Sequence, residues 1–320
     1  MGKKNRRTNH FDQLSTSSDA VLVTGGSGFI GRAFVKKLAE SDRTVVSMYR
    51  HRLPEPMPNV YPVCSDLESV DLLKAPLRGV ETVVYLAWEN STLANSSEAC
   101  SSDQCQNVKR LGNLIEAMEA VGTKRMIFVS ANGASRLATS DFLREKYQAE
   151  FKIVNSSIPQ KIVVRPTIVS SGSNEHDKFI ESIVNITKFP GIYPVPRLRE
   201  NIAPINLYDF CKTLMHLLTA PMQDSLSITE LVGEEGYSIE EVFRLVSEKY
   251  TRGTKLQIKG KIGNSLVPIF EGKDSKFVLG HPRIKHYLTL GHQITESVAH
   301  SNPVMNALPK RKRTFKESLR

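Results

Sequence analysis

The sequence predicts an α/β protein, with a doubly wound parallel sheet and a smaller C-terminal α+β lobe. Two patterns support this fold class. From Ala20 onward, short runs rich in β-branched residues alternate with longer segments of helical periodicity, which is typical of β-α-β units. The first run leads directly into a glycine-rich turn and then a helix. With 320 residues, 40% of them hydrophobic, the chain can bury the core that this fold needs.

The individual elements follow from these patterns in chain order. The expected strands are Ala20–Thr24, Thr44–Tyr49, Val60–Cys64, Thr82–Ala87, Arg125–Ser130 and Lys161–Arg165. Between them, helices are expected at Ile30–Ser41, Val70–Leu77, Asp103–Val121 and Asp141–Ser156. Later helices are expected at Lys178–Lys188, Tyr208–Leu218 and Ser238–Lys249, with strand and turn over Ser225–Gly236. Ser238 followed three residues later by Glu241 predicts a capping box.

The turn after the first strand predicts a dinucleotide site. It reads Thr24-Gly25-Gly26-Ser27-Gly28-Phe29-Ile30-Gly31. At such a turn, backbone N–H groups and the positive end of the helix dipole bind a diphosphate. Gly25 would form the tight turn, Gly28 would allow the close approach of the phosphates, and Gly31 would allow close packing of helix on strand. The expected sheet is therefore a Rossmann sheet.

The end of the second strand predicts which dinucleotide binds. An acidic residue at this position contacts the ribose 2′-hydroxyl of NAD, whereas an arginine accommodates the 2′-phosphate of NADP. The sequence here has no acid and continues from Tyr49 into Arg50. We therefore expect NADP, with Arg50 as the first contact and Arg32 as a second, and NAD as the alternative. The alternative is that both arginines are simply exposed to solvent and bind no ligand.

Charge and composition divide the chain further. The net charge is +10, of which residues 1–10 carry +4 and residues 309–320 carry +5, so the body is nearly neutral. We expect basic flexible tails at 1–18 and 301–320, a nucleotide-binding domain at 19–165 to which 201–222 returns, and a substrate lobe at 166–300. Basic tails bind nucleic acid weakly at most. The sequence shows no membrane span or signal peptide, which favours a cytoplasmic protein.

Cysteine usage gives no sign of a metal site or a disulfide framework. Cys64, Cys100, Cys105 and Cys211 form no C-x-x-C pair, and no histidine accompanies them at zinc-ligand spacing. They are interpreted as buried or incidental thiols.

Several ordered motifs from Ala20 to Lys249 resemble the extended or atypical short-chain dehydrogenases/reductases, in the branch of NAD-dependent epimerase/dehydratase-like proteins. The glycine turn is similar to the cofactor turn of that family, which implies that Ser27, Phe29 and Ile30 also contact the cofactor. Asp66-Leu67 resembles its adenine-contacting pair, and Leu86-Ala87 resembles the strand end beneath the cofactor.

The resemblance also implies a catalytic centre, and here the sequence departs from the family. The family uses a tyrosine four residues before a lysine, with a serine on the exit of the fifth strand. Lys146 matches the lysine, and Ser130 is the best-placed match for the serine, with Asn132 and Ser135 as alternatives on the same exit loop. Phe142, however, stands where the tyrosine is expected, so Lys146 would also fit a role in holding the nicotinamide ribose hydroxyl groups without a catalytic tyrosine. A phenyl ring cannot transfer a proton, and Tyr147 lies about 100° from Lys146 around the helix. Either Tyr147 has taken over the proton transfer, or that chemistry is absent.

Three functional hypotheses follow. The first is an NADP(H)-dependent reductase or epimerase acting on a keto or hydroxyl carbon, with a nucleotide- or lipid-linked sugar among the candidate substrates. The second is a cofactor-binding regulator or scaffold without hydride transfer, which Phe142 motivates. The third is an RNA-binding atypical relative acting through its basic tails, which the neutral body disfavours. The partners expected are a small-molecule substrate and a second copy of the chain.

Overall fold

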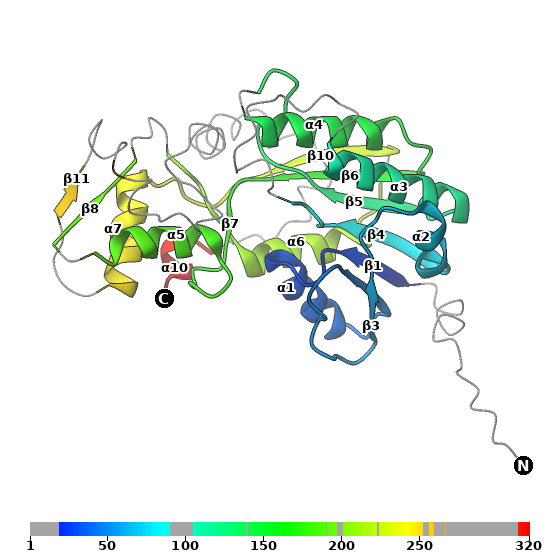
Figure 1. Ribbon diagram of the computed structural model, residues 1–320, viewed down its shortest axis with the longest axis horizontal. Helices are drawn as coiled ribbons and strands as arrows, with labels where there is room; N and C mark the ends of the chain where they lie inside the picture. Colours follow the sequence, from blue (N-terminus) through cyan, green and yellow to red (C-terminus); the bar gives the residue numbers. More distant parts are fainter. Residues whose placement is uncertain are drawn as a thin grey trace, which may run out of the picture.

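A seven-stranded parallel sheet forms the core of the larger part of the molecule, to the right in Figure 1. The computed structural model describes residues 19–89, 105–138, 140–189, 191–196, 201–222, 224–251, 256–258, 266 and 313–320. The strand order is β10-β6-β5-β4-β1-β2-β3. The strands are β1 (Ala20–Thr24), β2 (Val45–Tyr49), β3 (Val60–Cys64), β4 (Val80–Tyr85), β5 (Arg125–Val129), β6 (Gln160–Pro166) and β10 (Leu226–Leu231). This arrangement confirms the doubly wound Rossmann sheet that the sequence predicts.

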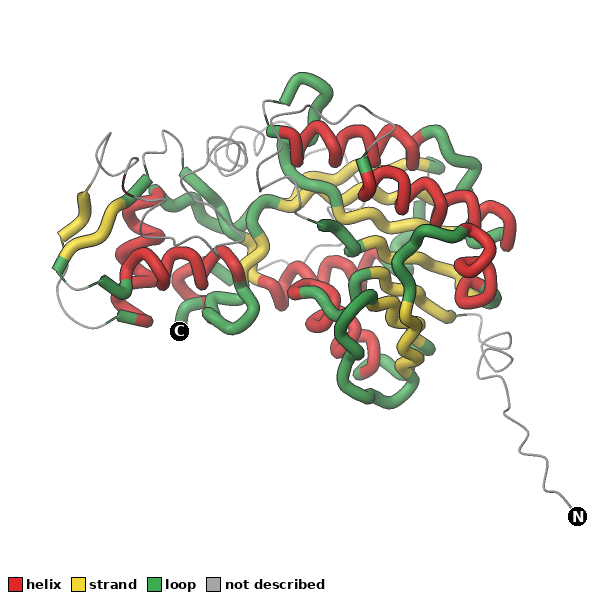
Figure 2. Tube along the Cα trace, in the orientation of Figure 1, coloured by secondary structure: helices red, strands yellow, loops and turns green. Residues whose placement is uncertain are grey.

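Helices cover both faces of the sheet and bury its hydrophobic side chains (Figure 2). One face packs against α2 (Val70–Leu77), α3 (Gln106–Val121) and α4 (Asp141–Val154). The opposite face packs against α1 (Phe29–Ala39) and α6 (Leu207–Leu217). Each helix presents one apolar stripe to strands that are buried on both sides, so two hydrophobic cores form around one sheet.

The predicted elements are present, and two of their differences have a physical cause. The expected strand Thr82–Ala87 stops at Tyr85, because the N–H groups of Leu86 and Ala87 both donate to Oγ1 of Thr24, at 3.1 Å each. The expected segment Ser225–Gly236 contributes β10, which pairs with β6 over six residues. Placing this segment in the second lobe was therefore wrong, since it forms an edge strand of the central sheet.

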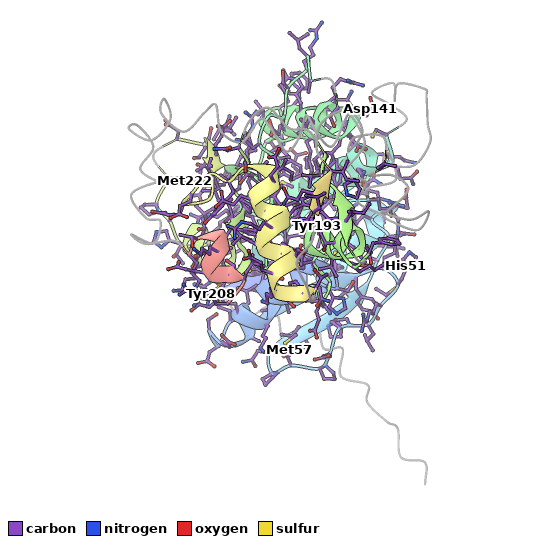
Figure 3. The ribbon with its side chains drawn as sticks, turned by 90° about the vertical axis from the view of Figure 1, so that its left-hand side faces the viewer. His51, Met57, Asp141, Tyr193, Tyr208 and Met222 are labelled. Atoms are coloured by element: carbon purple, nitrogen blue, oxygen red, sulfur yellow. The ribbon has the colours of Figure 1, made fainter. Side chains whose placement is uncertain are left out.

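The remaining described residues form a smaller lobe, which faces the viewer in Figure 3. Its helices are α5 (Lys178–Thr187) and α7 (Ile239–Tyr250), and β8 (Ile192–Pro194) pairs with β11 (Leu256–Ile258). The short strands β7 (Val169–Ser170) and β9 (Ile205–Asn206) pair with each other, one after β6 and the other before α6. Asp177 and Ser238 cap α5 and α7 by accepting backbone N–H groups.

The C-terminal segment corrects the prediction of a flexible tail over 301–320. Residues 313–320 pack into the smaller lobe, where α10 (Phe315–Ser318) starts with a capping box between Thr314 and Glu317. The Phe315 side chain is 2% exposed and contacts the rings of Phe179 and Tyr237. Net charge predicts solvation for this segment, but several contacts hold it together: Phe315 and Leu319 are buried, Asn206 donates to the Ser318 hydroxyl, and the Arg313 N–H donates to Asp209. The expected tail at 1–18 and residues 301–312 lie outside the described residues.

Candidate functional site

The glycine turn between β1 and α1 has the geometry of a phosphate-binding turn. Gly25 has a φ of +68°, and a Cβ atom there would come within 2.9 Å of the backbone of Ala87. A Cβ atom on Gly31 would overlap the carbonyl group of Gly25. Gly28 is the N-cap of α1 and offers no side-chain acceptor to the first turn of the helix. The turn therefore leaves backbone N–H donors at the positive end of α1, where an anion binds well.

Three cavities surround this turn. The first, called the edge cavity, has a volume of about 280 Å³ and lies over the carboxyl ends of β1, β2, β3 and β4. It brings together eight predicted cofactor residues: Gly25, Ser27, Gly28, Arg50, Asp66, Leu67, Leu86 and Ala87. Ligands of Rossmann folds bind at this edge of the sheet.

An ion-pair network that sequence reasoning missed forms one wall of the edge cavity. Arg50 pairs with Glu89, and Glu89 also accepts a hydrogen bond from the Arg110 guanidinium at 2.7 Å. Arg110 in turn donates to Glu68 at 2.7 Å, and this contact contributes, after that of Gln106, to a lowered pKa of Glu68. The spacing between Arg50 and Glu89 in the sequence gives no signal of their contact, because it depends on the β1–β2 and β1–β4 pairings.

The second cavity, called the basic cavity, has a volume of about 480 Å³. It shares Ser27 and Arg52 with the edge cavity and adds Arg32 and Lys36 from α1. The Nε atom of Arg32 is buried and has no hydrogen-bond partner within the described part of the chain. A buried donor without a partner is costly, so this guanidinium is suited to an anionic ligand. Arg32 was predicted, whereas Arg52 and Lys36 were missed.

The third cavity, called the lysine cavity, has a volume of about 350 Å³ and shares Gly25 and Gly28 of the turn with the edge cavity. Its lining includes the predicted Phe29, Ile30, Gly31, Ser130 and Lys146. The Lys146 amine donates to the carbonyl oxygen of Val129 at 2.9 Å and lies 3.7 Å from the centre of the Trp88 ring. Burial lowers the pKa of Lys146 to about 7, although Glu145 and Glu150 act in the opposite direction.

Ser130 lines the lysine cavity, but its hydroxyl group is engaged. It donates to the carboxylate of Glu150, which also accepts two hydrogen bonds from Arg165, at 3.0 and 2.6 Å. The hydroxyl thus belongs to a buried ion-pair network that joins α4 to β6. A substrate oxygen would have to compete with this network for the hydrogen bond.

The predicted tyrosine is not in the cavity. Phe142 lines the lysine cavity together with Lys146, one helical turn away on the same face of α4. Tyr147 lines none of the edge, basic and lysine cavities. The uninterrupted α4 helix explains this, because adjacent helical residues point in directions about 100° apart, so Tyr147 and Lys146 face different sides.

Comparison with known proteins agrees with this geometry. The family model described as NAD(P)H-binding matches residues 25–186, about half of the chain, from the glycine turn into α5. This chain belongs to the NAD(P)H-binding family. Its fold is that of the extended short-chain dehydrogenases/reductases, as the motifs predict. The structure and the family match support NAD(P) as the cofactor class.

Several known proteins are similar to this NAD(P)H-binding chain. NADH dehydrogenase [ubiquinone] 1 alpha subcomplex subunit 9, mitochondrial, from Dictyostelium discoideum is 24% identical over 260 residues, 79% of this chain and 70% of that protein. UDP-glucose 4-epimerase from Vibrio cholerae is 29% identical over 171 residues, 47% of this chain and 52% of the epimerase. The solved structure of a nucleoside-diphosphate-sugar epimerase from Staphylococcus aureus has a TM-score of 0.69 at 16% identity, covering 94% of this chain and 99% of that one.

None of the helices in the described ranges is both long enough and apolar enough to cross a membrane. Cys64 is exposed, Cys211 is buried, and the buried Cys105 thiol donates a hydrogen bond to the carboxylate of Glu145. Cys100 lies outside the described residues.

Proposed function

We propose that this chain holds NADP(H) as a bound nucleotide and does not use it for tyrosine-dependent hydride transfer. The observation that carries the proposal is the pairing of Phe142, not a tyrosine, with Lys146 in the lysine cavity. The adenosine would lie in the edge cavity and the diphosphate on the glycine turn. The nicotinamide half would lie in the lysine cavity, where Lys146 would hold the ribose hydroxyl groups. When bound, NADPH would supply a hydride to a substrate, and NADP+ would accept one.

The preference for NADP rests on the arginines where the edge and basic cavities meet. Arg50 already pairs with Glu89, whereas the Nε atom of Arg32 has no partner among the described residues. Arg52 lines both cavities. We therefore assign the 2′-phosphate first to Arg32 and Arg52 and only then to Arg50. Guanidinium groups bind phosphate through paired, charge-assisted hydrogen bonds.

The absence of hydride transfer rests on the two hydroxyl groups of the expected catalytic set. The tyrosine hydroxyl is replaced by the phenyl ring of Phe142, and the Ser130 hydroxyl donates to Glu150. Such a site would bind the nucleotide as the family does but would lack the hydroxyl group that transfers the proton. The similarity to a subunit of NADH dehydrogenase supports a role as a nucleotide-stabilised subunit of a larger assembly.

A second candidate function is a reductase or epimerase in which Lys146 transfers the proton. The lowered pKa of about 7 favours it, because an amine with that pKa exists in both protonation states near neutral pH. The similarity to UDP-glucose 4-epimerase makes a nucleotide-linked keto sugar the first substrate class to test.

The experiment compares binding with turnover. Calorimetry should show NADPH binding more tightly than NADH, and Arg32→Ala should weaken NADPH binding about tenfold while leaving NADH binding unchanged. Arg43→Ala is the matched control, since Arg43 lines none of the three cavities. NADPH absorbance should not fall with a panel of 4-keto sugar nucleotides. Oxidation that Lys146→Met abolishes would establish the second candidate, and a folded chain that binds neither nucleotide would end both.

Two expectations from the sequence remain predictions. A cytoplasmic location is one, and the mitochondrial relative makes cell fractionation the measurement that checks it. A homodimer is the other, and sedimentation of the purified chain checks it.

A further inference from the structure

The loop between β7 and α5 lines two of the cavities that the glycine turn also lines. His176 lines both the basic and the lysine cavities. The turn takes part in the same two cavities, through Gly26 and Ser27 in the first and through Gly25 and Gly28 in the second. A diphosphate lying on the turn would therefore occupy cavities that His176 also lines.

The backbone of His176 adopts a conformation that histidine seldom takes. Its φ is +62°, in the left-handed region, which costs free energy for a residue with a Cβ atom. The neighbouring Asp177 holds this conformation: its carboxylate is 1% exposed and accepts from Ser170 Oγ at 2.7 Å and from the Ser171 N–H at 2.8 Å. The same carboxylate accepts from the N–H groups of Phe179 and Ile180 at the start of α5.

The other end of the loop is fixed to the smaller lobe. The Gly172 carbonyl oxygen accepts from the Tyr250 hydroxyl at 2.6 Å and from the Lys249 amine at 3.2 Å. The Cα of Gly172 packs so closely on the Ser318 carbonyl of α10 that a Cβ atom would not fit. The loop is thus anchored by α5, α7 and α10, and this anchoring sets the position of the exposed His176 side chain.

We propose that the His176 imidazole donates a hydrogen bond to the diphosphate of the bound nucleotide and so closes the site. This inference rests on the proposed function, since it places NADP(H) across the cavities. The charges around His176 suit an anionic ligand: Arg32, Lys36 and Arg52 line the basic cavity, and Lys146 and Lys178 line the lysine cavity. The acidic residues of these linings are Glu55, Glu175 and Asp177, the last of which is occupied as the cap of α5.

The test removes the imidazole and keeps the backbone. His176→Asn is suited to this, because asparagine tolerates a positive φ better than most residues. Asn174→Ala is the matched control in the same loop, since Asn174 is exposed and lines none of the three cavities. Calorimetry is performed on the full chain with three ligands: NADPH, 2′-phospho-ADP-ribose, which has the diphosphate but no nicotinamide, and 2′-AMP, which has neither.

We expect His176→Asn to weaken NADPH and 2′-phospho-ADP-ribose equally, by about tenfold, and to leave 2′-AMP unchanged, while Asn174→Ala changes none of the three. Unchanged 2′-AMP binding shows that the variant has kept its adenosine site. Three results would overturn the assignment to the diphosphate. The variant could bind NADPH as tightly as wild type, it could lose as much affinity for 2′-AMP as for NADPH, or it could lose affinity for NADPH alone. If the wild-type chain binds none of the ligands, the proposed function fails together with this inference.

Discussion

Replacing Lys146 by methionine should remove a specific pH dependence of stability. The folded protein releases the Lys146 proton near pH 7, whereas an unfolded chain keeps it until its ordinary value of 10.5. Between these two values the unfolded state binds more protons, so the free energy of unfolding rises with pH. The contribution is about 1.4 kcal/mol for each pH unit inside that window. From pH 8 to 9.5 the wild-type chain should therefore gain about 2 kcal/mol that Lys146→Met does not gain.

The assay is urea unfolding at several pH values, followed by the fluorescence of Trp88, the single tryptophan of the sequence. This reporter lies against the lysine, with 3.7 Å between the Lys146 amine and the centre of the ring. Lys146→Met also loses the hydrogen bond to Val129. This loss changes the free energy of unfolding by the same amount at every pH, so it does not affect the slope of that free energy against pH. Lys152→Met, on the same helix but exposed, is the control and should keep the wild-type slope. Equal slopes for wild type and Lys146→Met would show that the buried amine does not titrate as argued.

Three further predictions concern packing. Gly31→Ala places a methyl group on the Gly25 carbonyl and should weaken NADPH binding at least about tenfold by calorimetry; unchanged binding would contradict the close helix–strand contact. Gly172→Ala combines a φ of +70° with a clash against Ser318, so the thermal midpoint and the NADPH affinity should both fall, and a loss of neither would show that α10 does not support the loop. Phe315→Ala should lower the free energy of unfolding by about 3–5 kcal/mol in urea titrations. A decrease no larger than that of an exposed substitution would indicate that α10 does not contribute to the stability of the fold.

The sequence predicted the sheet well because its signals are local. Each central strand is a short apolar run between turn residues, and the glycine turn specifies the first strand–helix junction almost alone. The helix Val70–Leu77 and the strands Ala20–Thr24 and Val60–Cys64 were placed with the ends that the structure shows. Seven of the predicted cofactor residues lie in the turn itself or directly after it. Residues so close in sequence to the turn are also close to it in space, so the turn motif alone locates them.

What the sequence missed depends on contacts between distant segments. Glu89 reaches Arg50 and Arg110 only because β4 lies beside β1 in the sheet, and Ser130 reaches Glu150 because α4 packs beside β5. His176 carried no motif, and its position at two of the cavities depends on the anchoring of its loop. The prediction of a flexible tail was wrong for the C-terminal segment because lysines and arginines dominate its composition, while its packing depends on Phe315 and Leu319 and on hydrogen bonds with the distant residues Asn206 and Asp209.

The contact between Phe179 and Phe315 has a consequence for folding kinetics. These rings lie 6.3 Å apart in space but are joined by more than a hundred residues of chain, so the packing of α10 onto the core of the smaller lobe depends on closing a very long loop. Closing such a loop costs more conformational entropy than pairing neighbouring β-α units, so it is expected to be slower. The segment at 313–320 should therefore join the smaller lobe last, and refolding should show a late phase in which this segment becomes protected from hydrogen exchange.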